Sequence, residues 1–434
     1  MHDLDRTYHI GPIALAPTVL PRHGWSFLVV AFFSIGLMIF ISIGQTYILN
    51  EHLGVPEAVQ GSVSGNLVFL TEMITLLLFL PAGVLMDRIG RRGVYAAGFL
   101  VLALTYVLYP LAGSVETLYL YRILYAIGVV AVAGGLSTVL ADYPAERSRG
   151  KLVAIVGVMS GLGIVLISQG FGALPKVLVN AGYDGIAAGR ITHFMVAGLA
   201  VAVAVLILWG LKPGLPVRTQ DRPSVRDLLR RGFARGRNPR IALAYSSAFI
   251  ARGDQSVNAI FLVLWGTLAG KAVGMESAAA VMSGTMIFVI AQIAALVWAP
   301  ILGPLLDRID RVTGLAICMA LAALGNLGLL ALSDPFSSLG PIFFVLLGIG
   351  QISVYLGGQS LIGQEAPVGE RGAVLGAFNV AGAVGILLIT PIGGYLFDRV
   401  DPRAPFVVVG VINVLLMLAS IHLRMRLGPA NHSN

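Results

Sequence analysis

The decapeptide ARGDQSVNAI, residues 251–260, places one cation and one anion in a run that is otherwise uncharged from Ile241 to Leu268. An acid in such surroundings can bind and release a proton, and an arginine can hold an anion. Arg252 and Asp254 are two residues apart, so on a regular helix their side chains point about 200° apart. Either each has its own partner, or Gly253 lets the helix open locally.

Two further ionisable residues, Glu72 and Arg122, also lie within apolar runs. Glu72 precedes Asp87, at the end of its run, by about 22 Å of helix. Arg122 lies a few residues from the opposite end of its own run, so the two are at comparable depth and can pair. A purely structural ion pair is an equally good interpretation. We predict that Glu72, Arg122, Arg252 and Asp254 form a charge relay that couples to protons.

The sequence lacks the motifs that ATP binding, metal binding and nucleophilic catalysis require. Gly150-Lys151 and Gly270-Lys271 are followed by Leu and Ala without the upstream glycines of an ATP-binding loop, so we expect neither ATP nor another cofactor. No His-Glu-x-x-His or Gly-x-Ser-x-Gly run is present, and the histidines are scattered. We therefore expect no catalytic residues, no metal site and no enzyme activity.

The elements that position these charges are membrane helices. Only 12% of the 434 residues are charged, 57% are hydrophobic, and the mean hydropathy is +0.87. A helical span needs about 20 apolar residues, whereas the strands of a membrane barrel would give short alternating runs. Twelve suitable stretches are present: 25–48, 61–86, 93–113, 117–140, 151–176, 190–211, 240–269, 277–302, 312–333, 340–362, 373–397 and 404–424. The sequence predicts an all-α, multi-pass membrane protein.

The basic residues predict how the chain is oriented. If residue 1 is cytoplasmic, the outer connections carry only Lys176, Arg190, Lys271, Arg399 and Arg403. Apart from Arg122 and Arg252, the remaining Lys and Arg residues fall on the inner side, which is the usual bias. We therefore predict both termini in the cytoplasm, and contact of the basic residues with membrane lipids rather than nucleic acid. We expect the protein to lie in the plasma membrane, which in a bacterium is the inner membrane.

A long basic connection divides the spans into six and six. We predict an N-terminal arm (1–24), a first bundle (25–211), a cytoplasmic linker (212–239), a second bundle (240–424) and a tail (425–434). The linker attracts anionic lipid headgroups, and Val225 to Phe233 can form a short amphipathic helix.

The two halves repeat one motif. The stretch GVLMDRIGRR, residues 83–92, recurs 220 residues later as GPLLDRIDRV, residues 303–312. Placed between the second and third of twelve spans, GVLMDRIGRRG resembles the signature loop of the major facilitator superfamily. That resemblance implies two pseudo-symmetric six-helix bundles, and a loop that acts as a conformational latch. The latch residues would be Gly83, Asp87, Arg88, Gly90, Arg91, Arg92, Gly303, Asp307, Arg308 and Arg311.

The second copy departs from the pattern at two positions. Asp310 stands where a glycine is expected and Val312 replaces the last arginine, so the second latch is expected to be weaker. The residues of the motif can also be interpreted without the resemblance. Gly83 predicts that another helix approaches closely, and Asp87 is an acid at a helix end, where it can meet a helix dipole or an arginine.

The resemblance also implies which spans line a central cavity, namely the first, fourth, seventh and tenth. Polar residues at helical spacing on these spans are Ser42, Gln45, Tyr125, Gln255, Asn258, Gln351, Tyr355 and Gln359. They can bind a substrate, which we favour, or bond between helices. Asn326, in the ninth span, is expected to be interhelical.

We therefore predict a monomeric secondary transporter that moves a small organic solute by alternating access and is coupled to protons. Two intramembrane arginines favour an organic anion, and the aromatic residues favour an amphipathic or lipophilic compound. An uncoupled facilitator or a multidrug-type effluxer is the alternative, and a non-transporting receptor or sensor is a remote one. The offset of 220 pairs Arg252 and Asp254 with Phe32 and Ser34, so this charged pair belongs to the second half alone.

Overall fold

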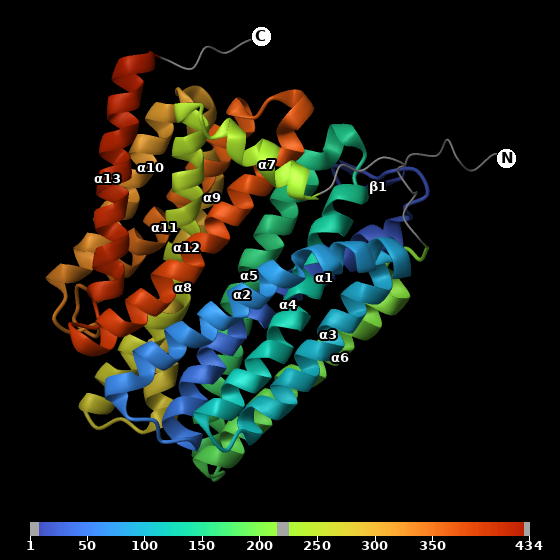
Figure 1. Ribbon diagram of the computed structural model, residues 1–434. Helices are drawn as coiled ribbons and strands as arrows, with labels where there is room; N and C mark the ends of the chain where they lie inside the picture. The colour runs from blue at the N-terminus through green and yellow to red at the C-terminus, as the bar shows by residue number, and fades with distance from the viewer. Residues whose placement is uncertain (1–7, 215–224, 429–434) are drawn as a thin grey trace. The chain divides into compact units, whose positions relative to one another are not determined.

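The computed structural model describes residues 8–214 and 225–428, which are almost entirely helical (Figure 1). Eleven of the described helices are long and apolar enough to cross a membrane. Helix α8, Pro239–Ala272, has 34 residues and is not among the eleven. It carries Arg252 and Asp254, and polar residues of that kind lower the apolar content of a span. Each of the twelve predicted spans coincides with one long helix, which confirms the all-α membrane fold.

The chain forms two compact units. Unit 1 comprises residues 1–54, 73–220 and 277–282, and unit 2 comprises residues 55–72, 221–276 and 283–434. The helices of unit 1 are α1 Pro21–Tyr47, α3 Arg91–Leu108, α4 Val115–Asp142, α5 Arg149–Asn180 and α6 Gly185–Gly210, with the short turns η1 Ile48–His52, η2 Tyr109–Leu111 and η3 Glu146–Ser148. The helices of unit 2 are α7 Val225–Arg235, α8, most of α9 Ser277–Arg308, α10 Arg311–Gly328, α11 Gly340–Glu365, α12 Arg371–Arg399 and α13 Ala404–Leu427, with the turns η4 Leu329–Ala331 and η5 Val368–Glu370. Helix α2, Glu57–Ile89, contributes to both units.

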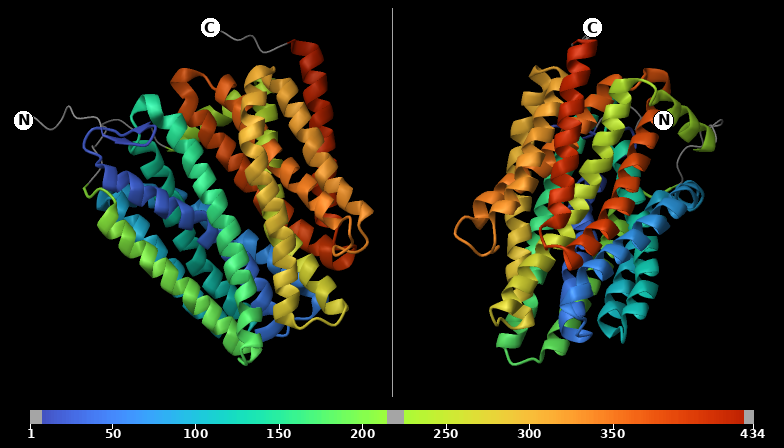
Figure 2. Two further views of the ribbon diagram at one scale, coloured as in Figure 1. Left: turned by 180° about the vertical axis from the view of Figure 1, so that it is seen from behind. Right: turned by 60° about the vertical axis from the view of Figure 1, so that its left-hand side comes forward.

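Small residues let the helices of unit 1 approach closely. A Cβ at Gly163 of α5 would overlap the backbone carbonyl of Phe32 on α1, and one at Gly135 of α4 would overlap the ring of Tyr95 on α3. Helix α3 also runs beside α6, as the views of Figures 1 and 2 show. Such close backbone approach is the usual basis of helix packing in lipid, where the hydrophobic effect does not drive helices together.

Unit 2 uses the same device around α8. A Cβ at Gly385 of α12 would overlap the carbonyl of Phe249, and one at Gly253 would overlap the side chain of Ile389. Helix α8 therefore runs unbroken through Gly253, against the possibility that this glycine opens it.

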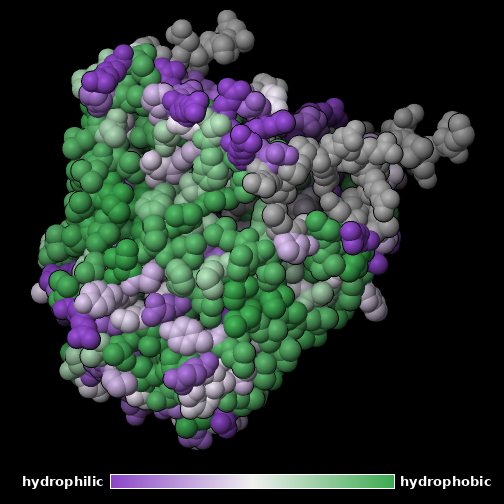
Figure 3. Space-filling view, in the orientation of Figure 1, coloured by the Kyte–Doolittle hydropathy of each residue, from purple (hydrophilic) through white to green (hydrophobic). Residues whose placement is uncertain are grey.

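The outer faces of the helices are apolar. Leu77, Trp209 and Leu415 are 69%, 85% and 59% exposed. On the face drawn in Figure 3, hydrophobic residues cover the sides of the helices, and hydrophilic residues gather toward helix ends. This pattern fits a surface that is covered by lipid tails.

Two small elements lie outside the long helices. The predicted N-terminal arm contains a hairpin of β1, His9–Ile10, and β2, Ile13–Ala14, which was not predicted. Its Ala14 N–H donates to Ser148 Oγ at 3.0 Å, so the hairpin is fixed to the turn before α5. Helix α7 confirms the amphipathic helix predicted in the linker, and the Tyr245 hydroxyl donates to the Gly232 carbonyl at 2.8 Å.

Candidate functional site

Asp254 lies inside unit 2 rather than on an open face. It is 0% exposed, although it lies on the seventh span, which was expected to line the central cavity. Its Oδ1 accepts a hydrogen bond from Asn258 Nδ2 at 3.1 Å, one helical turn along α8. Asn326 Nδ2 of α10 lies 3.4 Å from both carboxylate oxygens. The acid therefore has its own partners, and they are amides.

A second layer of amides surrounds these contacts. Gln351 Oε1 of α11 accepts from Asn258 Nδ2 at 2.8 Å and from Gln292 Nε2 of α9 at 3.5 Å. We call these five residues, Asp254, Asn258, Gln292, Asn326 and Gln351, the Asp254 cluster. Its residues come from four helices, α8, α9, α10 and α11, which are thus joined by one network of buried hydrogen bonds.

No described side chain of unit 2 forms an ion pair with Asp254. Arg252 is exposed, and its aliphatic stem lies against Gly382 of α12, where a Cβ would come within 2.7 Å of Arg252 Cγ. The prediction that the two side chains do not face each other is confirmed. A fully buried carboxylate without a cation costs several kcal/mol, and amide donors offset this only in part. Binding of a proton or a cation would neutralise the charge.

The repeat shows what is special about this position. Ser34, which corresponds to Asp254 in the first half, is also 0% exposed, and its hydroxyl is 2.7 Å from the Tyr95 hydroxyl of α3. Both halves thus join their first and third helices by a buried polar contact. Only the second half puts an acid there, which favours a functional role over a scaffold role.

The sequence assigned the members of the cluster to different roles. Asp254 was predicted for proton coupling, and Asn258 and Gln351 for substrate contact, whereas all three meet in one cluster. The prediction that Asn326 makes an interhelical contact is confirmed, and the contact on the neighbouring helix is the acid itself. A lone amide in an apolar stretch was the only signal, and it does not reveal which helix the amide faces.

In unit 1, Arg122 of α4 is buried at 2% exposure. Its guanidinium lies 4.8 Å from the centre of the Tyr125 ring, and it is hydrogen-bonded to Tyr109. The Tyr109 hydroxyl donates to Gln45 Oε1 at 3.2 Å, and the Tyr125 hydroxyl donates to the Met38 carbonyl. The predicted relay residue Arg122 and the predicted cavity residues Gln45 and Tyr125 are thus brought together in the interior of unit 1.

Glu72 is half-buried at the end of the α2 segment that belongs to unit 2, where it interacts electrostatically with Arg252 of α8. Its pairing with Arg122 stays a prediction. The other predicted cavity residues, Ser42, Gln255, Tyr355 and Gln359, are half-buried and retain some accessible surface.

The first latch motif turns the chain between α2 and α3. Gly90 has φ +101°, a value that favours glycine, and it precedes the first residue of α3. Arg91 forms an ion pair with Asp142 at the end of α4. No atom lies within 4 Å of a Cβ built at Gly83 or at Gly303, so the close helix approach predicted at Gly83 is not seen. The helix passes open space there, and the side chain of Asp87 lies outside the described residues.

Arg88 and Arg92 flank this turn in the first copy, and Arg308 is exposed in the second. There Asp307 pairs with Arg311 at 2.9 Å, one turn apart along the chain. Asp310, which replaces the glycine, accepts from the Thr313 N–H at 2.9 Å and caps α10. It also pairs with Arg424 of α13 at 3.1 Å. Asp310 thus supplies an N-cap and an ion pair where the first copy has a glycine with positive φ. The expectation that the second latch is weaker stays a prediction.

Comparison with known proteins places this geometry in a family. Residues 26–388 and 245–434 match the model of the Major Facilitator Superfamily. Magnetosome protein MamH of Paramagnetospirillum magneticum (strain ATCC 700264 / AMB-1) is 29% identical over 95% of both chains. Magnetosome protein MamZ of the same organism is 27% identical over 88% of this chain, which spans only 60% of that relative.

The fold agrees with solved transporters. The crystal structure of nucleoside transporter NupG matches 92% of this chain and 98% of its own chain, at 15% identity, with a TM-score of 0.72. A likeness at this identity concerns the fold alone. The family match, by contrast, spans nearly the whole sequence, and the family is one of transporters rather than enzymes. The chain belongs to the Major Facilitator Superfamily and is a multi-pass membrane transporter that binds a small molecule.

Proposed function

We propose that this chain is a secondary transporter that moves a small organic solute by alternating access and couples that movement to protons through Asp254. The observation that carries the proposal is a fully buried carboxylate whose partners in unit 2 are amides. Intramembrane acids of this kind mark ion pathways in transporters. Neutralisation of Asp254 changes the hydrogen bonds of four helices at once, and this links proton binding to a change of conformation.

The solute is proposed to be an organic anion. Arg252 exposes its guanidinium two residues from Asp254, and half-buried Gln255 lies on the same helix. Tyr355 and Gln359 of α11 add a phenol and an amide one turn apart. An arginine with nearby hydrogen-bonding groups suits a carboxylate or phosphate and an adjoining polar body. Arg122 is proposed to act indirectly, because Tyr125 and Tyr109 already surround it.

Gradient-driven flux in proteoliposomes tests the coupling. A panel of radiolabelled organic anions is offered to the full chain with and without an imposed pH gradient, and an internal pH-sensitive dye reports proton movement. We expect the wild-type protein to accumulate one of the solutes above equilibrium. Asp254→Asn should carry that solute downhill only, because the amide cannot release a proton. Arg252→Gln should raise the half-saturating concentration about tenfold or more.

Thr267→Val on the same helix serves as the matched control. Thr267 is 0% exposed, and its hydroxyl donates to the Val263 carbonyl at 2.7 Å, away from the cluster. Coupled transport should survive this change. Unchanged dependence on the gradient in both Asp254→Asn and Glu72→Gln would refute proton coupling and leave the uncoupled facilitator. Transport of lipophilic dyes in place of anions would instead support the multidrug-type effluxer.

A further inference from the structure

A small cavity lies between α1, α5 and α6 of unit 1. It is lined by Phe40 and Gly44 of α1, Phe171 of α5, and Thr192 and His193 of α6. The centre of a water molecule has about 10 Å³ in which to lie there. A single buried water needs about 10–15 Å³ of such space. The cavity therefore has the size of one water molecule and is too small for an organic solute.

His193 directs a hydrogen-bond acceptor at this cavity. The side chain is 1% exposed, and its Nδ1 lies 2.8 Å from the Gly189 carbonyl, one turn earlier in α6. Because a carbonyl oxygen only accepts, Nδ1 carries the proton, and Nε2 of the neutral ring is left as an acceptor. Nε2 has no hydrogen-bond partner among the described residues. A Cβ built at Gly44 would lie 2.6 Å from Nε2, so this nitrogen faces the part of α1 that lines the cavity.

Ser168 of α5 is a second buried polar group of unit 1 whose side chain has no partner among the described residues. Other buried hydroxyls of this unit bond within their own helix: Thr192 and Thr105 donate to the carbonyls four residues earlier, at 2.8 and 2.9 Å. Ser168 does not make that bond, although it is 0% exposed. It precedes Phe171 and Gly172 by three and four residues, so it lies on the face of α5 that lines the cavity. Its hydroxyl proton is therefore available to a partner outside its own helix.

Pro175 frees a backbone acceptor in the same wall. It lies within α5, four residues after Phe171, and both residues line the cavity. Proline has no N–H, so the Phe171 carbonyl cannot receive the usual helical hydrogen bond from this position. In membrane helices, ordered waters are among the partners that satisfy carbonyls freed in this way. The cavity thus adjoins two acceptors and one donor that share a need for a partner.

We infer that this cavity binds one water molecule, which donates hydrogen bonds to His193 Nε2 and to the Phe171 carbonyl and accepts one from the Ser168 hydroxyl. Three hydrogen bonds are typical of a buried water. Such a water satisfies all three protein groups at once, and it joins α5 to α6 in the interior of unit 1. The site goes beyond the proposed function, because it depends neither on the transported solute nor on the coupling ion.

Hydroxyl-radical labelling driven by X-ray radiolysis tests the site in the purified full chain in detergent. The radicals form from water itself, so a buried side chain is labelled only where a water molecule lies beside it. Phe40, which is 1% exposed and lines the cavity, should be labelled. Phe99 of α3, which is 0% exposed and does not line the cavity, is the internal control and should stay at background. Mass spectrometry of the digested protein measures both.

Two variants remove the water by different routes. Gly44→Ala places a methyl group beside His193 Nε2 and leaves the polar partners in place, so the labelling of Phe40 should be lost. Ser168→Ala removes the donor and should lower that labelling toward the background. Thr105→Val is the matched control, because its hydroxyl bonds within α3, and it should label as the wild type does. Melting curves verify that each variant is folded.

Labelling of Phe40 at the background level of Phe99 in the wild-type protein would overturn the inference. Wild-type labelling of Phe40 in the folded Ser168→Ala variant would overturn it as well, because the radicals would then come from a water that Ser168 does not hold. Ser168→Ala deletes a single oxygen atom, so it carries the test even if Gly44→Ala does not fold.

Discussion

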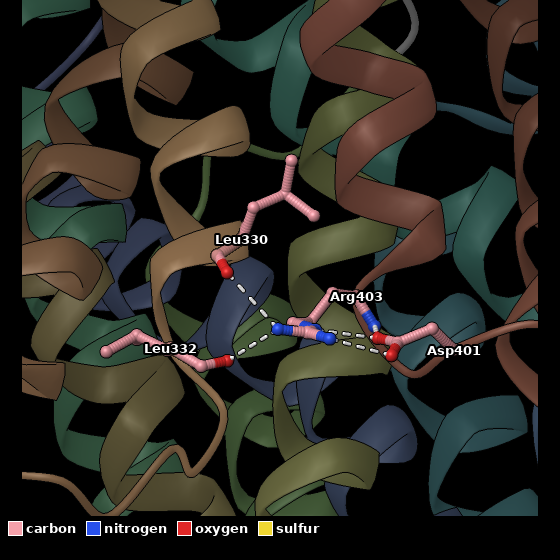
Figure 4. A network of polar contacts seen from close by, with 4 residues as sticks. All are labelled: Leu330, Leu332, Asp401 and Arg403. Atoms are coloured by element: carbon pink, nitrogen blue, oxygen red, sulfur yellow. Dashed lines mark hydrogen bonds and ion pairs between the residues drawn. The ribbon is translucent and has the colours of Figure 1, made fainter.

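At the scale of single residues, the arginines of this chain divide into two kinds. Arg252 keeps its guanidinium accessible, whereas Arg403 is fully engaged at the turn between α12 and α13 (Figure 4). Arg403 donates to both oxygens of Asp401, at 2.8 and 2.9 Å. It also donates to the carbonyls of Leu330 and Leu332, at 3.2 and 3.0 Å, near the end of α10. This side chain therefore stabilises a turn.

Replacing Arg403 by Ala should lower the free energy of unfolding by about 1 kcal/mol, because charged hydrogen bonds are lost at a partly exposed site. Arg399→Ala, an exposed neighbour on the same turn, should leave stability nearly unchanged. Thermal unfolding in detergent measures both. Equal melting temperatures for Arg403→Ala and the wild type would show that the network adds nothing.

The same network predicts a pH dependence. The hydrogen bonds from Arg403 hold the pKa of Asp401 below its ordinary value. A depressed folded-state pKa contributes stability that is present above the unfolded pKa and is lost as the pH falls through the folded value. The difference in melting temperature between wild type and Arg403→Ala should therefore be full near neutral pH and shrink below about pH 4. A difference that grows with acidification would contradict the assignment.

At the scale of elements, the sequence predicted the long helices well and their contacts poorly. Hydropathy alone located every span, since a membrane demands about 20 apolar residues whatever the neighbours are. It could not show that Gly83 faces open space while Gly385 touches Phe249, because both are glycines in apolar helices. For the same reason Asn326 was not recognised as a partner of Asp254. Which face of a helix meets which neighbour is a tertiary property.

Two glycines of α12 turn this distinction into an experiment. A Cβ at Gly385 would overlap the Phe249 carbonyl of α8, whereas one at Gly376 has no atom within 4 Å. Gly385→Ala should therefore force α8 and α12 apart and destabilise the protein by about 1–3 kcal/mol. Gly376→Ala should be neutral or stabilise by up to about 1 kcal/mol, because alanine favours the helix. Melting temperatures that do not separate the two variants would count against this packing.

At the scale of the whole molecule, α2 and α9 each belong to both units, and α2 is divided near its middle. Its first part, residues 57–72, belongs to unit 2, where the Asp398 carboxylate accepts from the backbone N–H groups of Gly61 and Ser62 at 2.8 and 2.7 Å. Glu57 adds an ion pair with Lys271 at 3.6 Å. The rest of α2 belongs to unit 1. Any rearrangement between the units must therefore bend α2 near Glu72 or release it from α12.

Hydrogen exchange measured by mass spectrometry separates these possibilities. In the resting wild-type protein the amides of Gly61 and Ser62 should be protected by Asp398, and Asp398→Asn should speed their exchange about tenfold or more, since a bond to a charged group contributes about 1.5–3 kcal/mol. A peptide from α10 in the same digest serves as the internal control and should be unaffected.

If alternating access releases α2 from α12, then saturating solute or an imposed gradient should also deprotect Gly61 and Ser62 in the wild-type protein. If α2 bends instead, these two amides should stay protected while exchange rises around Glu72. Exchange that is uniform across α2 and indifferent to Asp398→Asn would show that this contact does not hold the helix, and the two units would then have to be coupled by some other element.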